Sequence, residues 1–267
     1  MNILKKTIAP LTDVAWKEIS DETDRFLKIY LTGRKFVDIN GPNGLEMGGL
    51  STGRLVMPGK NNKNGVNYGI REFIPLIEIR KPFELDLWEL DNIDRGAEDV
   101  DLDPLEEAVK QVAQFEEQVI YDGFEKANIK GFEKSAEKPG VDLPSDPEKF
   151  LDIISGEIIS LQKDGVQGPY SLVLDETAWK NMNKLTRGYP VRNQLKELIG
   201  GKILINHFNN KSFLVSEQGG DYELAIGQDI TLGYDGHTTE KVKLYLTESI
   251  TFRVISPEAV RVLNSKK

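Results

Sequence analysis

The chain has 267 residues, of which 39% are hydrophobic and 29% charged, a composition typical of a globular protein with a sizeable core. Its formal net charge of −9 shows no basic excess, so we expect no nucleic-acid partner. The lack of cysteine excludes disulfides, thiolate metal sites and cysteine nucleophiles, and two histidines are too few for a histidine-rich metal site. We therefore predict no metal site.

Neither end of the chain predicts export or membrane insertion. Two lysines near the N-terminus are followed by no long apolar stretch, so the sequence predicts no secretory signal. No run approaches the roughly 18 apolar residues that a membrane span requires. We expect a cytoplasmic protein with no membrane partner.

The first third of the chain predicts a helix, a hairpin and a strand. Residues 12–30 predict a helix with Thr12 at its N-cap and an apolar face. Glycines punctuate residues 40–69, which predict a long β-hairpin with its tip at 59–65. Such an arm either packs on another chain or is mobile, and both alternatives stay open. Alternating residues predict one strand over 76–90, with Trp88 on its polar face.

The rest of the chain predicts a spine helix and two mixed regions. A long helix is expected over 103–128, where Pro104 follows Asp103. Breakers at 134–147 indicate a subdomain boundary. Strands and helices then alternate, and the residues after 222 predict mainly strands with a short final helix from Ser256.

The motifs of known chemistry are incomplete. Gly49–Gly53 contains Ser51 in the pattern of a nucleophile elbow, but its surroundings predict a hairpin instead of a strand followed by a helix. Asp99 begins a calcium-loop pattern that fails at Pro104 and Lys110. No phosphate-binding loop is present. The residues therefore favour a structural or assembly role.

Several segments together resemble the shell proteins of encapsulin nanocompartments, family 1 (linocin-M18-like). The segments are IAPLT at 8–12, GRKFVD at 33–38, PLIEIR at 75–80, LDLWELDN at 85–92, GVQGPY at 165–170, VSEQGGD at 215–221, GQDI at 227–230, and Thr247-Glu248 with Phe252. The resemblance spans nearly the whole chain, and the pair LDLWELDN and VSE-x-GGD is its most specific part.

This resemblance implies an α+β chain with the HK97-type capsid fold. Its expected parts are an N-terminal helix or arm at 1–40, an E-loop at 41–75, and a P-domain at 76–137 with the spine helix at 103–128. An A-domain at 138–221 and P-domain return strands with a C-terminal helix at 222–267 complete the division.

The resemblance also implies a function without turnover of its own. Such chains self-assemble into hollow icosahedral shells, here expected to be a T=1 homo-oligomer of 60 copies. The shell encloses a cargo enzyme, for example a ferritin-like protein for iron storage or a dye-decolourising peroxidase against oxidative stress. The cargo is captured through its C-terminal peptide, so we predict a shell protein that is not an enzyme.

Three groups of residues match sites of the family. The cargo-peptide groove is expected to use Phe26, Leu27, Tyr30, Arg34, Asp38, Asp229 and Ile230. The five-fold pore loop is expected at Leu185, Thr186, Arg187, Gly188, Tyr189 and Pro190. Arg80 and Trp88 match a flavin (FMN) site of some relatives, although no cofactor is required. The alternatives are that the groove residues only hold the helix to the core, and that Trp88 is interfacial without a ligand.

Two other functions stay open at this stage. A tailed-phage major capsid protein would share the fold, although the acidic balance and the absence of a long leader speak against it. A peptidase or bacteriocin would use Ser51 as its nucleophile, with His207 or His237 later in the chain.

Overall fold

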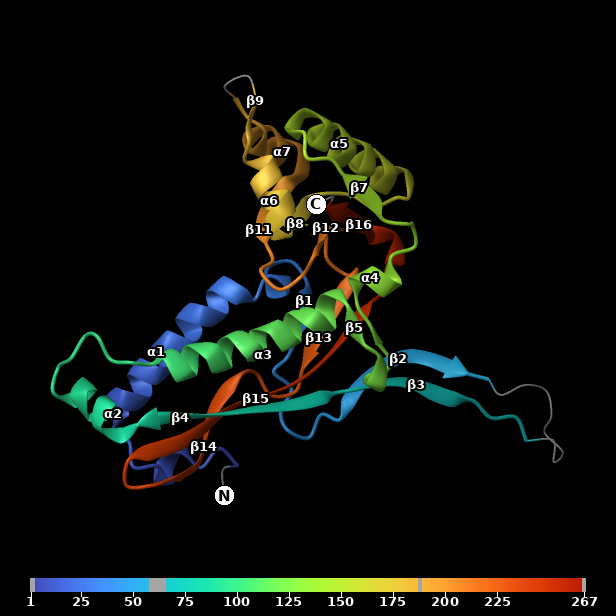
Figure 1. Cartoon of the computed structure of the whole chain (residues 1–267). Coiled ribbons are helices and arrows are strands. Elements are labelled where there is room, and N and C mark those ends of the chain that lie inside the picture. The colour runs from blue at the N-terminus through green and yellow to red at the C-terminus, as the bar shows by residue number, and fades with distance from the viewer. Residues whose placement is uncertain (1–2, 58–65, 187–188, 266–267) are drawn as a thin grey trace.

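Two sheets of five strands each organise the part of the chain that the structure describes (Figure 1). The structure is a computed structural model, and it describes residues 3–57, 66–186 and 189–265. The first sheet has the order β1-β13-β15-β14, with β4 on the other edge of β15. Its strands are β1 (Asp38–Asn40), β4 (Ile77–Asp86), β13 (Tyr222–Ile226), β14 (Thr231–His237) and β15 (Lys241–Val254). Strands from both ends of the chain therefore meet in this sheet, the P-domain of the predicted fold.

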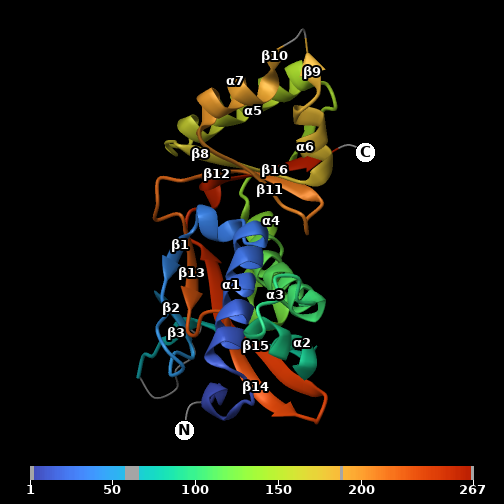
Figure 2. The same ribbon diagram turned by 90° about the vertical axis from the view of Figure 1, so that its left-hand side faces the viewer.

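Long-range pairing with β4 anchors the central strand of this sheet. β15 and β4 run antiparallel from Lys241 opposite Asp86 to Ile250 opposite Ile77. Burial alternates along β4, whereas β15 is buried on both faces from Leu244 to Phe252, as expected for a central strand. Helices α1 (Asp13–Tyr30), α2 (Leu87–Asp94) and α3 (Asp103–Tyr121) lie with this sheet, and α1 packs along α3 (Figures 1 and 2).

The second sheet lies at the other end of the molecule (Figure 2), mostly in residues predicted to form the A-domain, and is called the A-domain sheet below. Its order is β11-β8-β12-β16-β7, from Gly200–Ile205, Tyr170–Leu174, Lys211–Ser216, Val260–Ser265 and Val141–Leu143. The accompanying helices are α4 (Phe132–Ser135), α5 (Pro147–Lys163), α6 (Glu176–Met182) and α7 (Val191–Ile199). One buried core continues from this sheet into the end of α3 and β13, so the two parts are packed together.

A two-stranded hairpin extends away from both sheets (Figure 1). β2 (Gly49–Val56) pairs antiparallel with β3 (Ile70–Pro75), as the glycine-punctuated sequence predicts. Most of its side chains are exposed. The predicted tip at 59–65 lies outside the described residues. The predicted hairpin is thus confirmed, and it lies within the residues expected to form the E-loop.

Three predicted elements are wrong in their bounds or type. The strand expected over 76–90 ends at Asp86, whose side chain accepts hydrogen bonds from the backbone N–H groups of Trp88 and Glu89 and so caps α2. The spine helix ends at Tyr121 instead of 128, because Gly123, at φ 86°, begins a small hairpin of β5 (Gly123–Phe124) and β6 (Ile129–Lys130).

The third error is at the C-terminus. The expected final helix is only the 3₁₀ turn η4 (Pro257–Ala259), and the chain continues as β16. β16 pairs antiparallel with β12 and parallel with β7, so the last described residues belong to the A-domain sheet and not to the P-domain. Val260, Val262 and Leu263 of β16 are buried, and so is Arg261 between them.

Candidate functional site

A groove of about 500 Å³ runs along one side of the C-terminal half of α1. Its lining combines apolar and charged side chains from α1, the following turn η2 (Gly33–Lys35) and the segment before β14. The lining residues are Asp24, Leu27, Lys28, Leu31, Arg34, Lys35, Asp229 and Ile230. A second hollow of about 490 Å³ shares Asp229 and Ile230 and continues toward Ile3, Leu4 and Leu45. Apolar residues flanked by charges over this length suit an extended peptide.

Helical periodicity in α1 separates the groove from the core. Thr12 caps the helix by accepting a hydrogen bond from the Ala15 N–H at 3.1 Å. Ala15, Ile19, Thr23 and Phe26 are buried against the core, whereas Leu27 and Lys28 lie on the neighbouring face. The sequence positions 24, 27, 28 and 31 share one side of a helix. Sequence reasoning missed Asp24, Lys28, Leu31 and Lys35, and this spacing was the signal that identifies the first three.

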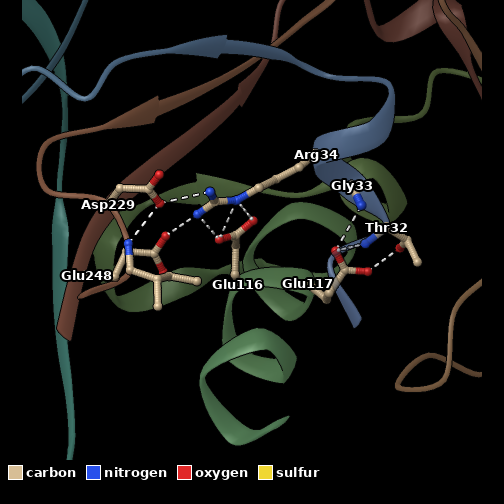
Figure 3. A network of polar contacts seen from close by, with 8 residues as sticks. Thr32, Gly33, Arg34, Glu116, Glu117, Asp229 and Glu248 are labelled. Carbon is tan, nitrogen blue, oxygen red and sulfur yellow. Dashed lines mark hydrogen bonds and ion pairs between the residues drawn. The ribbon is translucent and has the colours of Figure 1, made fainter. Parts of the chain in front are cut away.

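Arg34 lies between three carboxylates from distant parts of the chain (Figure 3). Its guanidinium donates to Glu116 through Nε at 2.8 Å and Nη2 at 2.7 Å, to Glu248 at 2.6 Å and to Asp229 at 2.8 Å. Glu116 and Glu248 are fully buried, while the Asp229 side chain is 48% exposed. The guanidinium thus forms its ion pairs with residues of the same chain. This arrangement favours the alternative that Arg34 holds the α1 segment to the core.

The charges in this cluster are unequal. Burial acts to lower the pKa of Arg34, but the hydrogen bond and charge of Glu116, with Glu248 and Asp229, outweigh it and raise the pKa. Burial, then the charge of Glu116, raises the pKa of Glu248 well above its ordinary range. One oxygen of Glu248, Oε2, is buried without a hydrogen-bond partner. One guanidinium does not balance three carboxylates, and the excess negative charge together with burial favours the neutral form of Glu248.

Glu117, the next residue of α3, accepts hydrogen bonds from the backbone of the turn that carries Arg34 (Figure 3). Its Oε1 accepts from the backbone N–H groups of Thr32 and Gly33, both at 2.9 Å, and its Oε2 contacts Thr32 Oγ1. A β-carbon at Gly33 would stand 2.6 Å from Ile120 Cδ1, so a larger residue would require the Ile120 side chain to move. The side chains of two consecutive glutamates thus fix the end of α1.

The structure brings together four of the seven residues predicted for the groove. Leu27, Arg34, Asp229 and Ile230 line it. Phe26 is instead buried in the core, and Tyr30 packs on Phe208 with ring centroids 5.5 Å apart.

The seventh predicted groove residue, Asp38, lies in β1. Its carboxylate accepts a hydrogen bond from the Gly220 backbone N–H. It does not line the groove, and neither do Phe26 and Tyr30. Asp38 was predicted by motif match, which carries no information on the direction of a side chain. Phe26 and Tyr30 were predicted from the apolar character of the helix, which does not distinguish the core from the groove.

The predicted pore loop lies at the tip of the A-domain (Figures 1 and 2). β9 (Leu185–Thr186) pairs antiparallel with β10 (Tyr189–Pro190). Arg187 and Gly188 lie outside the described residues. The loop is thus a small hairpin that α7 follows directly.

Arg80 and Trp88, the residues predicted for a flavin, have different neighbours within the chain. Arg80 lies over the Tyr245 ring, 4.3 Å from its centroid, whereas Trp88 is 69% exposed at the start of α2. Six residues of strand, about 20 Å, separate Arg80 from Asp86. Arg95 lies 6.0 Å from the indole ring. Flavin binding at these residues stays a prediction.

The serine hypothesis lacks its geometry. Ser51 lies in the middle of β2, opposite Phe73 in the hairpin, with no helix following it. His237 pairs with Tyr234 in β14, and His207 lies 3.9 Å from Glu176 in the A-domain. Within the described ranges, no group of three His, Cys, Asp or Glu side chains is placed to hold a metal ion. A search of the same ranges finds no helix with the length and apolarity needed to cross a membrane.

Comparison with known proteins identifies the family. The Linocin_M18 model, described as an encapsulating protein for peroxidase, matches residues 1–251. The type 1 encapsulin shell protein of Mycobacterium tuberculosis is 37% identical over 97% of this chain and 98% of its own length. That of Rhodococcus erythropolis is 38% identical over the same shares. The chain belongs to the type 1 encapsulin shell proteins.

Solved structures confirm the fold of this encapsulin chain. A virus-like particle from Pyrococcus furiosus matches with a TM-score of 0.68 at 18% identity, over 94% of this chain and 98% of that one. The capsid of the Myoviridae phage XM1 matches with a TM-score of 0.54 at 11% identity, over 88% and 91%. The predicted HK97-type capsid fold is thus confirmed. Encapsulin shell proteins are structural, so this chain is a shell-forming protein and not an enzyme.

Proposed function

We propose that 60 copies of this chain close into a hollow icosahedral T=1 shell in the cytoplasm, which encloses a cargo enzyme. The observation that carries the proposal is the exposed apolar hairpin. Its large apolar side chains, each more than half exposed, are Leu55, Val56, Met57, Val66, Tyr68, Ile70 and Phe73. A single chain leaves this arm without a core, whereas neighbouring copies around a closed shell would cover it.

The groove along α1 supports capture of cargo through a C-terminal peptide. It offers Leu27 and Ile230 as apolar contacts and Lys28, Lys35 and Asp229 as charged ones. A volume of about 500 Å³ lies within the usual range for ligand sites. The family's description as an encapsulating protein for peroxidase favours a peroxidase as cargo, which would serve against oxidative stress, and a ferritin-like iron-storage protein is the alternative. Either would place the chemistry in the cargo.

Electron microscopy of the untagged protein from its own host tests this proposal. We expect closed particles of uniform diameter, with a co-purifying enzyme that mass spectrometry identifies. Sedimentation should give the mass of 60 shell copies plus cargo. Monomers or small oligomers across a range of salt and protein concentration would contradict the proposal.

A charge in the hairpin should prevent closure. Ile70 is 61% exposed on β3, so Ile70→Glu should leave the fold intact but place a charge in every proposed contact between copies. We expect loss of closed particles in sedimentation with an unchanged circular dichroism spectrum. Ile70→Val is the matched control and should still assemble. Closed shells from Ile70→Glu would show that the hairpin does not carry assembly.

Shortening an apolar groove residue should reduce loading. Burying a leucine contributes about 1.5–3 kcal/mol, so Leu27→Ala should lower the cargo-to-shell ratio about tenfold or more. Ile29→Ala is the control on the same helix, because Ile29 is 46% exposed and does not line the groove. The ratio is measured by quantitative mass spectrometry of purified shells. Equal loading of both variants would exclude this groove as the capture site.

A further inference from the structure

The turn that ends α1 rests on a buried acid with no positive partner. Glu117 is 1% exposed, and it accepts two backbone hydrogen bonds from Thr32 and Gly33. In the described part of the chain, no lysine, arginine or histidine is paired with it. Burying an ionised carboxylate without a cation is costly, whereas a neutral carboxylic acid can be buried with its hydrogen bonds satisfied.

A chain of hydroxyl groups allows Glu117 to exist in either protonation state. Its Oε2 contacts Thr32 Oγ1, which lies 2.8 Å from the Tyr121 hydroxyl. When protonated, Glu117 donates to Thr32, which donates to Tyr121. When ionised, Glu117 accepts from Thr32, which accepts from Tyr121. Both states keep the hydrogen bonds, so the difference between them is the buried charge.

The surroundings of Glu117 favour the protonated state. The titratable groups within five residues of it on α3 and its C-cap are Glu116, Tyr121 and Asp122, none of which is positive, and Lys110 lies two turns away with an exposed side chain. From η2 the facing charge is Arg34, whose guanidinium is bound by Glu116, Glu248 and Asp229. From the A-domain, Asn206 and Asn209 face it and are uncharged. Burial raises the pKa of Glu117 to about 8, against hydrogen bonds from Thr32 and Gly33 that act to lower it.

A cavity gives this buried acid a route for its proton. It measures about 220 Å³ and lies between α3 and the segment that joins β11 to β12. Glu117, Tyr121, Asp122 and Asn206 are among its lining residues. Asn206 Nδ2 is buried there without a hydrogen-bond partner, so the cavity offers polar contacts to water. Water in this cavity would exchange protons with Glu117.

We propose that Glu117 is a proton-controlled latch, which holds the end of α1 and η2 against α3 while protonated and loosens this junction once it loses its proton. The latch regulates the groove proposed above, because α1 forms one wall of it; only this consequence rests on the proposed function. A shell would then grip its cargo more firmly in acid than in mild alkali.

The raised pKa of Glu117 determines whether the junction becomes more or less stable as the pH rises. The carboxyl has an ordinary pKa of 4.5 in the unfolded chain and a pKa of about 8 when folded. Its stabilising contribution is complete below 4.5, declines as the pH rises, and is lost above about 8. Within this window the population of the loosened junction should rise up to about tenfold per pH unit, the slope for one proton.

Hydrogen exchange on the purified, cargo-free protein tests the latch. After correction for intrinsic exchange, peptides covering residues 27–36 should lose protection by about tenfold or more between pH 6 and pH 8. Glu117→Gln keeps the shape of the neutral acid and should show no such loss. The matched control, Glu107→Gln, changes an exposed acid of α3 and should behave as the unmodified chain.

Infrared spectroscopy supplies a second readout. The unmodified protein should show a neutral carboxyl band with a component that disappears near pH 8, and Glu117→Gln should lack that component. An identical pH response of the unmodified protein and Glu117→Gln, or no such component in the unmodified protein, would overturn the latch. Sedimentation measures shell assembly independently of these two readouts. Failure to form shells would therefore contradict the proposed function, while the latch would still be judged by hydrogen exchange and infrared spectroscopy.

Discussion

Replacing Arg34 with alanine is expected to destabilise the chain by about 3–5 kcal/mol, because it leaves buried acids without their cation. Glu116 and Glu248 have no exposed side-chain surface, and their ion pairs with Arg34 measure 2.7 and 2.6 Å. Only the Asp229 carboxylate is exposed enough for water to replace the guanidinium as its hydrogen-bond partner. The remaining carboxyl groups must therefore take up protons or bury charge, and either response costs stability.

Calorimetry on shells at one protein concentration and one scan rate measures this effect. For a chain of this size, each kcal/mol lowers the melting temperature by about 2–4 °C, so we expect a drop of about 10 °C. Arg95→Ala is the control, since its pair with Asp91 is exposed and 3.6 Å long, and should change little. A melting temperature within a degree or two of the unmodified protein would contradict the role of Arg34.

Phe132→Ala should be comparably severe, at about 3–5 kcal/mol, because it opens a cavity where the two sheets meet. Phe132 is fully buried in α4. Its ring neighbours are Phe36, Tyr121, Phe213, Tyr222 and Phe252, with centroids 4.8–6.1 Å away. These rings come from the residue after η2, from α3, from β12 in the second sheet, and from β13 and β15 in the first sheet. No nearby segment is free to fill the space.

Denaturation of both Phe132→Ala and Phe132→Leu separates cavity formation from loss of aromatic contact. Leucine fills most of the space, so its cost should be well below that of alanine. Both variants are compared with the unmodified chain by urea unfolding after disassembly. If leucine and alanine cost the same, the aromatic edge contacts matter more than the cavity.

Local patterns explain which parts of the fold the sequence predicts well. The apolar stripe and N-cap of residues 12–30, and the alternation around β15, report burial within a few residues of each position. The end of β4 at Asp86 also carries a local signal, since Asp86 followed by Glu89 has the spacing of a helix cap. That signal competes with the alternating pattern that continues to Trp88, and the helix prevails.

The residues that line the groove could be predicted only in part from local sequence patterns. Of the residues selected by motif match, Arg34, Asp229 and Ile230 line one groove, and Asp38 lies elsewhere. Of those selected from the apolar face of the helix, Leu27 lines the groove, and the side chains of Phe26 and Tyr30 pack elsewhere. The role of Arg34 depends on Glu116 and Glu248. No motif marked Glu116, and the family match at Thr247-Glu248 did not indicate that Glu248 pairs with Arg34.

The sequence by itself determined the family, the α+β class, the apolar hairpin and the helix that forms the groove wall, because these follow from motifs and from periodicities of two and 3.6 residues. Only the tertiary structure decided that β16 joins the A-domain sheet, that three carboxylates surround Arg34, and that Glu117 is buried without a cation. These depend on pairing and burial between distant segments, where the free energy of a charge is set by its neighbours in space and not in sequence.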